Sequence, residues 1–343
     1  MSGVRFMQEK KFISKYDSCN REKVRNFLEN YELYFDEAIE FTIAYFADGE
    51  IIATGSYDDQ VIKCLCVADE YRGYGLTSAI VSELIAEQYS NGITHLFVYT
   101  TPKNRSVFDA FHFHEIIEIP NKVLVMENKK DGLKKYITRL KKNSIKGQKA
   151  AALVMNCNPF TNGHRFLIEK AAKENEHVYL FIVMENRSEF SAEQRVELVK
   201  TGTQDLENVS VCEGKDYIIS KATFPTYFFK KQEDVVAIHA ELDATIFAKL
   251  IAPRLNITRR YVGEEPLCLV TNQYNQALAN ILPQFGIEVK VIPRLKEADE
   301  PISASKVRSL LAQKDYDGVT RLVPKHSVDQ LIDFWKQNQS SNV

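Results

Sequence analysis

The stretch AAALVMNCNPFTNGH, residues 150–164, decides the fold of the second half of the chain. Its first six residues form an apolar run that predicts a buried strand. Apolar residues at helical spacing follow the stretch, namely Phe166, Leu167, Ile168, Ala171 and Ala172. Thr161-Asn162-Gly163-His164 is therefore expected on a strand-to-helix turn. Such a turn directs free backbone N–H groups and the positive end of a helix at a bound group, which suits a triphosphate.

Strands and helices continue to alternate after this turn. A strand over 178–184 precedes a helix from Ser191, and further strands are predicted over 209–212, 259–262 and 288–292. This alternation predicts an α/β domain with a doubly wound parallel sheet. Ligands of such sheets bind at the carboxyl ends of the strands, which is where the Thr161 turn falls.

A second phosphate-binding pattern occurs near the end of the chain, in the segment ISASKVR, residues 302–308. Ser303 is placed to cap a helix that contains Ser305, Lys306 and Arg308. A helix start with hydroxyls and two cations can neutralise the β and γ phosphates as charge builds on a leaving pyrophosphate. An ordinary capped helix with exposed cations is the simpler alternative.

The first 128 residues show a different organisation. Apolar runs over 41–47 and 51–57 flank Asp48-Gly49, which predicts a β-hairpin, and a third buried strand is predicted over 61–67. A glycine-containing turn, residues 72–75, then leads to a helical pattern over 77–89 and another strand over 93–100. Antiparallel strands with a glycine turn and a helix predict an α+β domain over 1–128.

Residues 129–148 are interpreted as a basic linker between this domain and a second domain over 149–343. Nine Lys or Arg accompany a single acid, Asp131, over 129–149. Such a segment either contacts phosphate groups or forms a solvated connecting helix.

Composition excludes several classes of protein. Lys plus Arg (44) nearly balance Asp plus Glu (46), so no overall field favours nucleic acid or an anionic membrane. The six cysteines contain no CxxC pair, which argues against a disulfide framework or a structural metal. Neither a signal peptide nor a membrane-spanning run is evident, so a cytoplasmic location is expected. No GxxxxGK[ST] motif indicates a P-loop kinase.

The two phosphate-binding segments together resemble the nucleotidyltransferase superfamily, which carries TxGH or HxGH and ISxTxxR motifs. The resemblance implies a Rossmann-like domain that holds bent ATP between the motifs, with Mg²⁺ bound through the phosphates. It implies that His164 stabilises the pentavalent α phosphorus. The residues implied to hold phosphate oxygens are Thr161, Gly163, Ser303, Ser305, Lys306 and Arg308, and catalysis would rest on His164, Lys306 and Arg308.

The same resemblance suggests contacts for the rest of the nucleotide. Gly263 and Glu264 follow a predicted strand and are candidates for the ribose and base. Arg187 lies near the place of a cation that contacts the acceptor or the phosphates, although the spacing is one residue from the usual. Arg195 is interpreted as a structural residue at the start of a helix rather than a ligand.

Two further segments, 156–160 and 217–228, make the whole chain similar to the citrate lyase ligase family. This implies that acetate attacks ATP to give acetyl adenylate. The thiol of the phosphoribosyl-dephospho-CoA prosthetic group on the citrate lyase acyl carrier subunit then takes the acetyl group. A carboxylate acceptor is already anionic and needs no general base. The aromatic and hydroxyl groups of 217–228 either line an acetate pocket or form a core under a loop.

Arg72-Gly73-Tyr74-Gly75 after a predicted strand resembles the pyrophosphate loop of GNAT acetyltransferases. The resemblance implies that these residues bind the CoA-like arm. Glu70 departs from the usual Gln or Arg of that family, and Phe108 takes the place of the usual Tyr general acid. Because a phenyl ring cannot protonate a thiolate, we expect a domain that holds the arm and is not an independent acetyltransferase.

Two other functions remain open at this stage. One is transfer of AMP to a phosphate acceptor such as phosphopantetheine, which leaves the acyl-CoA-like domain unexplained. The other is a non-catalytic sensor of ATP and acyl-CoA, which leaves the full set of phosphate-binding groups unexplained.

Overall fold

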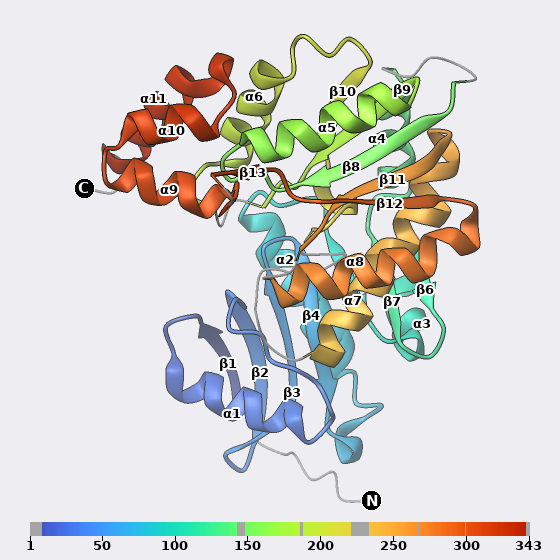
Figure 1. The fold of residues 1–343 in the computed structure, drawn as a ribbon. Helices are drawn as coiled ribbons and strands as arrows, with labels where there is room; N and C mark the ends of the chain where they lie inside the picture. Colours follow the sequence, from blue (N-terminus) through green and yellow to red (C-terminus); the bar gives the residue numbers. More distant parts are fainter. Residues whose placement is uncertain are drawn as a thin grey trace, which may run out of the picture. The chain divides into compact units, whose positions relative to one another are not determined.

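The computed structural model describes residues 9–142, 148–185, 188–220, 233–265, 268–298 and 300–340. Contacts divide the chain into two compact units, Met1–Gly132 and Leu133–Val343. Figure 1 shows the helices and strands of both. The predicted fold class is confirmed, because an α+β unit precedes an α/β unit whose main sheet is parallel.

The first unit is built on a seven-stranded sheet of order β1-β2-β3-β4-β5-β7-β6. The Asp48-Gly49 hairpin is confirmed between β2 and β3, and Gly49 has a φ of 86°. The helices and strands of the unit are β1 (Glu9–Ser14), α1 (Ser18–Glu29), β2 (Phe41–Ala47), β3 (Glu50–Asp58), β4 (Val61–Val67), α2 (Leu76–Ser90), β5 (Phe97–Thr100), α3 (Arg105–Ala110), β6 (His114–Ile119) and β7 (Val123–Glu127).

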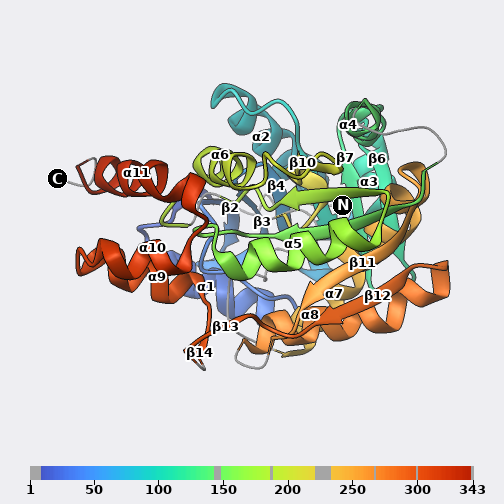
Figure 2. The same ribbon diagram turned by 45° about the horizontal axis from the view of Figure 1, so that its top comes forward.

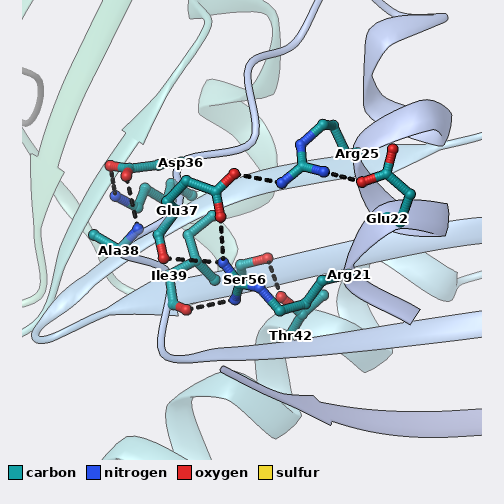
Figure 3. Close-up of polar contacts among 10 residues, drawn as sticks. Arg21, Glu22, Arg25, Asp36, Glu37, Ala38, Ile39, Thr42 and Ser56 are labelled. Carbon is teal, nitrogen blue, oxygen red and sulfur yellow. Dashed lines mark hydrogen bonds and ion pairs between the residues drawn. The ribbon is translucent and has the colours of Figure 1, made fainter. Parts of the chain in front are cut away.

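A polar network attaches α1 to the loop that follows it in this unit (Figure 3). The buried guanidinium of Arg21 donates to the carbonyl oxygens of Ile39 at 2.7 Å and Glu37 at 3.0 Å. Across the neighbouring strands, the hydroxyls of Thr42 and Ser56 bond at 2.8 Å. These bonds satisfy polar groups that would otherwise cost about 1–3 kcal/mol each when buried without a partner.

The second unit contains a five-stranded parallel sheet of order β10-β9-β8-β11-β12. A short pair, β13 with β14, and helices complete it. Its elements are α4 (Gly132–Lys141), β8 (Ala150–Met155), α5 (Asn162–Glu174), β9 (His177–Ile182), α6 (Ala192–Gly202), β10 (Val209–Glu213), α7 (Glu233–Ile246), β11 (Ile257–Gly263), α8 (Leu269–Ile281), β12 (Glu288–Ile292), β13 (Lys296–Glu297), β14 (Glu300–Pro301), α9 (Ala304–Ala312), α10 (Tyr316–Leu322) and α11 (Val328–Ser340).

Helices cover both faces of this sheet. Figure 2 shows α5 running along one face, where Ile168 of α5 packs in the same core as Leu153 of β8 and Val307 of α9. On the other face, the ring of Phe181 lies 6.5 Å from the ring of Phe247, the residue that follows α7. Each fully buried apolar side chain stabilises the folded state by roughly 1.5–3 kcal/mol, so this packing holds α5 and α9 in place.

The strand order places a crevice between β8 and β11. Numbered from β8, the order is 3-2-1-4-5, and chain connections leave the sheet in opposite directions at the boundary between its first and fourth strands. Ligands of doubly wound sheets bind at this switch point, outside the carboxyl ends of the strands. The turn after β8 and the end of β11 therefore border the expected ligand site.

Candidate functional site

The first motif caps α5. Thr161 is the N-cap residue and is 1% exposed, and its Oγ1 accepts a hydrogen bond from the His164 N–H at 3.4 Å. In return, Nδ1 of His164 accepts from the Thr161 N–H at 3.1 Å. The arrangement is a capping box in which His takes the place of the usual Glu or Gln. The predicted strand-to-helix turn is confirmed.

These capping bonds fix the protonation of the His164 ring. Since Nδ1 accepts a hydrogen bond, the proton of the neutral imidazole lies on Nε2. Burial, and secondly the positive charge of Arg294, lower the pKa of His164 to about 4. At neutral pH the ring is therefore uncharged and offers Nε2–H as a donor. No hydrogen bond within the described parts of the chain uses this nitrogen.

The first and second motifs meet at Gly163. A Cβ added at Gly163 would lie 3.5 Å from the carbonyl oxygen of Ile302 and 3.6 Å from its Cβ. These are ordinary van der Waals distances, so packing does not demand a glycine here. A Cβ at this position would pack against Ile302.

Ser303 caps α9, as predicted. Its Oγ accepts from the Lys306 N–H at 3.2 Å, and its backbone is extended. The ammonium of Lys306 pairs with the carboxylate of Glu300, and this pairing holds the pKa of Glu300 below its usual value. Both groups are exposed, so the pair is weak and an anionic ligand can compete for Lys306.

Arg308 joins the two motifs. Its Nη1 donates to the carbonyl oxygen of Asn158, in the loop between β8 and α5, and its Nη2 donates to Ser305 Oγ at 3.3 Å. The Asn158–Pro159 peptide bond is cis. One guanidinium thus connects segments 150 residues apart and brings its charge to the turn that carries His164.

The end of β11 lies beside the same turn. A Cβ added at Gly263 would lie 3.7 Å from Leu167 Cδ2 of α5, and the Glu264 N–H donates to Ile292 O at 2.9 Å. Gly263 O accepts from the Asn275 amide at 3.1 Å. The structure therefore brings Gly263 and Glu264 to the crevice edge expected for a nucleotide, as the third part of the site.

Arg294 is a cation of the site that the sequence reasoning missed. Its Nε donates to the Glu264 carbonyl at 2.9 Å, and its Nη2 pairs with the Glu265 carboxylate. It follows β12 by two residues, at the carboxyl edge of the sheet, and its charge acts on His164. The signal available in the sequence was the position of this cation, two residues after the predicted strand 288–292.

Replacing Arg294 with glutamine is expected to raise the pKa of His164 above about 4 while leaving it below 6.5. The charge of Arg294 is removed, but burial, the larger cause, remains. When the pKa of a histidine is lower in the folded than in the unfolded protein, the free energy of unfolding decreases as pH falls from about 6.5 toward about 4. This decrease should be smaller in the variant, because the two pKa values lie closer together. NMR titration of the imidazole measures the shift. Lys314→Gln removes an exposed cation elsewhere and is the control. If the pKa of His164 in Arg294→Gln equals that in the control, Arg294 does not act on His164.

Arg195 has the structural role that was predicted for it. The side chain is fully buried, and its guanidinium donates to Asn156 O at 2.8 Å, Asn156 Oδ1 at 2.7 Å and Val183 O at 2.6 Å. Further bonds reach the carbonyls of Phe190, at 3.2 Å, and Glu185. It thereby ties together the loops that follow β8 and β9. Arg187 lies outside the described residues.

The aromatic segment 217–228 is described only in part. Tyr217, Ile218 and Ile219 are buried, and the Tyr217 ring lies 5.0 Å from the ring of Tyr136 in α4. These residues form core rather than an open pocket wall. Residues 221–228 lie outside the described part of the chain.

In the first unit, the glycine turn leads from β4 to α2. Gly73 and Gly75 have φ values of 86° and 80°, and a Cβ at either would meet nothing within 4 Å. Arg72 pairs with Asp69 at 2.6 Å, and Tyr74 is 76% exposed. The parallel pairing of β4 with β5 joins Val61–Ile62 to Phe97–Val98, at the start of both strands.

Among the described residues, no helix combines the length and apolar character that crossing a bilayer requires. Within the same residues, no group of three or more His, Cys, Asp or Glu side chains could hold a metal ion.

Comparison with known proteins gives a family match, similar relatives and similar solved structures. The family model described as the citrate lyase ligase C-terminal domain matches residues 150–331. The [citrate [pro-3S]-lyase] ligase of Escherichia coli is 38% identical over 337 residues, 96% of each chain. That of Klebsiella pneumoniae is 35% identical over 92% of this chain and 94% of its own. An acyl-CoA N-acyltransferase structure from Pseudomonas aeruginosa matches 36% of this chain and 99% of its own, at 12% identity and a TM-score of 0.31.

Proposed function

Because this chain belongs to the citrate lyase ligase family, we propose that it uses ATP and acetate to acetylate, and so activate, citrate lyase. In the first step an acetate oxygen attacks the α phosphorus of ATP, the bond to the β-phosphate oxygen breaks, and pyrophosphate leaves. In the second, a thiol of the lyase's CoA-like prosthetic group attacks the acetyl carbonyl. AMP leaves and the thiol proton passes to solvent.

The meeting of the two motifs supports this proposal more than any other observation. The Gly163 backbone lies against Ile302, and Arg308 bonds to the loop that precedes Thr161. The helices that begin after Thr161 and Ser303 are thus proposed to direct their positive ends at one bound anion. A triphosphate is the nucleotide part that this arrangement suits best.

Each residue then has a chemical role. His164 donates Nε2–H to the α phosphate, where charge accumulates as the acceptor attacks. Lys306, Arg308 and the hydroxyls of Ser303 and Ser305 bind the β and γ phosphates and stabilise the leaving pyrophosphate. Because acetate attacks as an anion, rate enhancement rests on positioning and on charge stabilisation.

The remaining contacts position the nucleotide. Gly263 and Glu264 bind the ribose and base, and Arg294 holds their turn through the Glu264 carbonyl. The hydroxyls of Ser303 and Ser305 and the cations Lys306 and Arg308 lie at the proposed phosphate position, and the carboxylate beside them, that of Glu300, is paired with Lys306. This donor set suits Mg²⁺ bound through phosphate oxygens, where it would neutralise the charge of the triphosphate.

The first unit is proposed to hold the prosthetic arm. Gly73 and Gly75 leave the backbone N–H groups of the turn open to a pyrophosphate, with Arg72 and Tyr74 beside them. Phe108 is 0% exposed in the core of this unit and supplies no acid for acetyl transfer.

Replacing both Gly73 and Gly75 with valine is expected to impair transfer to the thiol and to spare acetate-dependent exchange of pyrophosphate into ATP. Side chains there would obstruct the arm and strain the left-handed backbone by about 1–2 kcal/mol per residue. Gly49→Val is the matched control, because Gly49 also has a positive φ and an open surrounding. Thiol acetylation that stays at the level of the control would refute the arm site.

Acetylation of deacetylated citrate lyase tests the whole proposal. Protein, ATP, Mg²⁺ and labelled acetate should transfer label to the lyase and restore its activity, with one AMP formed for each acetyl group. The ligase names of relatives that span nearly the whole chain favour this outcome over AMP transfer to phosphopantetheine or a sensor role. Formation of ADP, or label transfer without ATP, would refute the mechanism.

A further inference from the structure

Positive charge is concentrated in α4 and the residues just before it. Over residues 129–142 there are seven Lys or Arg and one acid, Asp131, whereas the whole chain has 44 cations and 46 acids. This excess is therefore local. It lies in the segment for which the sequence allows two interpretations, a contact with phosphate groups or a solvated connecting helix.

Contacts with the catalytic unit fix the orientation of α4. Tyr136, Ile137 and Leu140 are buried on one side, and the Tyr136 hydroxyl donates to the Glu213 carbonyl at 3.0 Å. On the exposed side, Lys135 and Arg139 lie at positions i and i+4 of the helix, and the exposed Lys142 follows directly after its last residue, Lys141. These three cations are called the stripe. None of these three makes an ion pair with another described residue.

The buried side of α4 contacts the edge of the sheet where the chemistry is proposed. Glu213 is the last residue of β10, and its carbonyl accepts the hydrogen bond from Tyr136, so α4 packs beside the carboxyl end of that strand. In a parallel sheet this edge also carries the turns after β8 and β11. A thiol held on another protein has to reach an adenylate at this edge, and its carrier must dock within reach.

We propose that the stripe Lys135, Arg139 and Lys142 is the docking surface for an acidic face of the citrate lyase subunit that carries the prosthetic arm. Three cations spread along about 10 Å of a convex helix complement a row of carboxylates. They do not converge on one phosphate, so the arm itself is a poorer fit. The proposal rests on the function proposed above and adds the surface that selects the partner.

Reversing the three charges tests the docking surface. For Lys135→Glu/Arg139→Glu/Lys142→Glu, the KM for deacetylated citrate lyase should rise at least about tenfold at low salt, with kcat little changed. Its dependence on salt between about 50 and 300 mM should flatten, because screening then has less attraction to remove. Acetate-dependent pyrophosphate exchange should stay at the wild-type rate.

A variant of equal charge provides the control. Lys173, Lys314 and Lys325 are exposed, and their triple replacement by Glu changes the net charge equally. An unaltered KM in the α4 variant, or the same rise in the control, would overturn the docking surface. Absence of acetate-dependent exchange in the wild-type protein would instead overturn the proposed function, so the two failures are distinguishable.

Discussion

Replacing His164 with alanine is expected to lower the rate of acetyl-adenylate formation by about 10²–10³-fold or more, with the fold retained. The site loses its Nε2–H donor at the atom where charge develops. The bond from the Thr161 N–H to Nδ1 is lost as well, which costs about 1 kcal/mol of stability, whereas the backbone N–H of residue 164 still bonds to Thr161 Oγ1. Acetate-dependent exchange of labelled pyrophosphate into ATP measures the rate, and thermal unfolding measures the stability.

A second substitution separates catalysis from capping. His164→Gln preserves the usual capping box, since the Gln Oε1 can accept from the Thr161 N–H. Its unfolding temperature should return to near the wild-type value while exchange stays slow. If exchange recovers together with stability, His164 is only a helix cap.

Replacing Arg195 with alanine is expected to destabilise the second unit by about 3–5 kcal/mol. Acceptors at Asn156, Val183 and Phe190 lose a buried donor, and water cannot serve all of them at once. The loops after β8 and β9 then lose their common anchor. Adenylation should fall as a result of misplacement, although Arg195 contacts no part of the proposed nucleotide.

Tryptophan fluorescence reports on this unit directly. Trp335 is the only tryptophan of the chain, and its ring lies 6.0 Å from that of Phe190, which accepts from Arg195. Urea unfolding followed by this signal should shift to lower urea in Arg195→Ala and by less in Arg195→Lys, which keeps a charge but has fewer donors. If the urea midpoint of unfolding is unchanged in Arg195→Ala while pyrophosphate exchange is lost, Arg195 contacts a ligand instead.

Local sequence was sufficient for the two helix caps of the site. Thr161 and Ser303 each precede an amphipathic run, and capping depends on residues only three positions away. The position of the Thr161 turn at the carboxyl edge of the sheet followed from the alternation of strands and helices, whereas its pairing with the Ser303 segment followed from the resemblance to a known superfamily. Strand β12 begins and ends where the pattern placed it, at Glu288 and Ile292.

Contacts between distant segments could not be predicted in the same way. The bond from Arg308 to Asn158 and that from Arg294 to Glu264 depend on the packing of strands and helices that the pattern does not align to within a residue. The low pKa of His164 has the same origin, because burial arises from tertiary structure. Likewise, composition marked α4 as basic but could not show which unit its apolar side contacts.

Exchange of labelled pyrophosphate into ATP, without citrate lyase, tests the central claim most directly. The two motifs should open ATP at the α phosphorus for acetate, so the wild-type protein should catalyse exchange that requires Mg²⁺ and rises with acetate to saturation. Exchange that ignores acetate but responds to a phosphate ester such as phosphopantetheine would contradict the account. Absence of exchange by a protein that still binds ATP would contradict it equally.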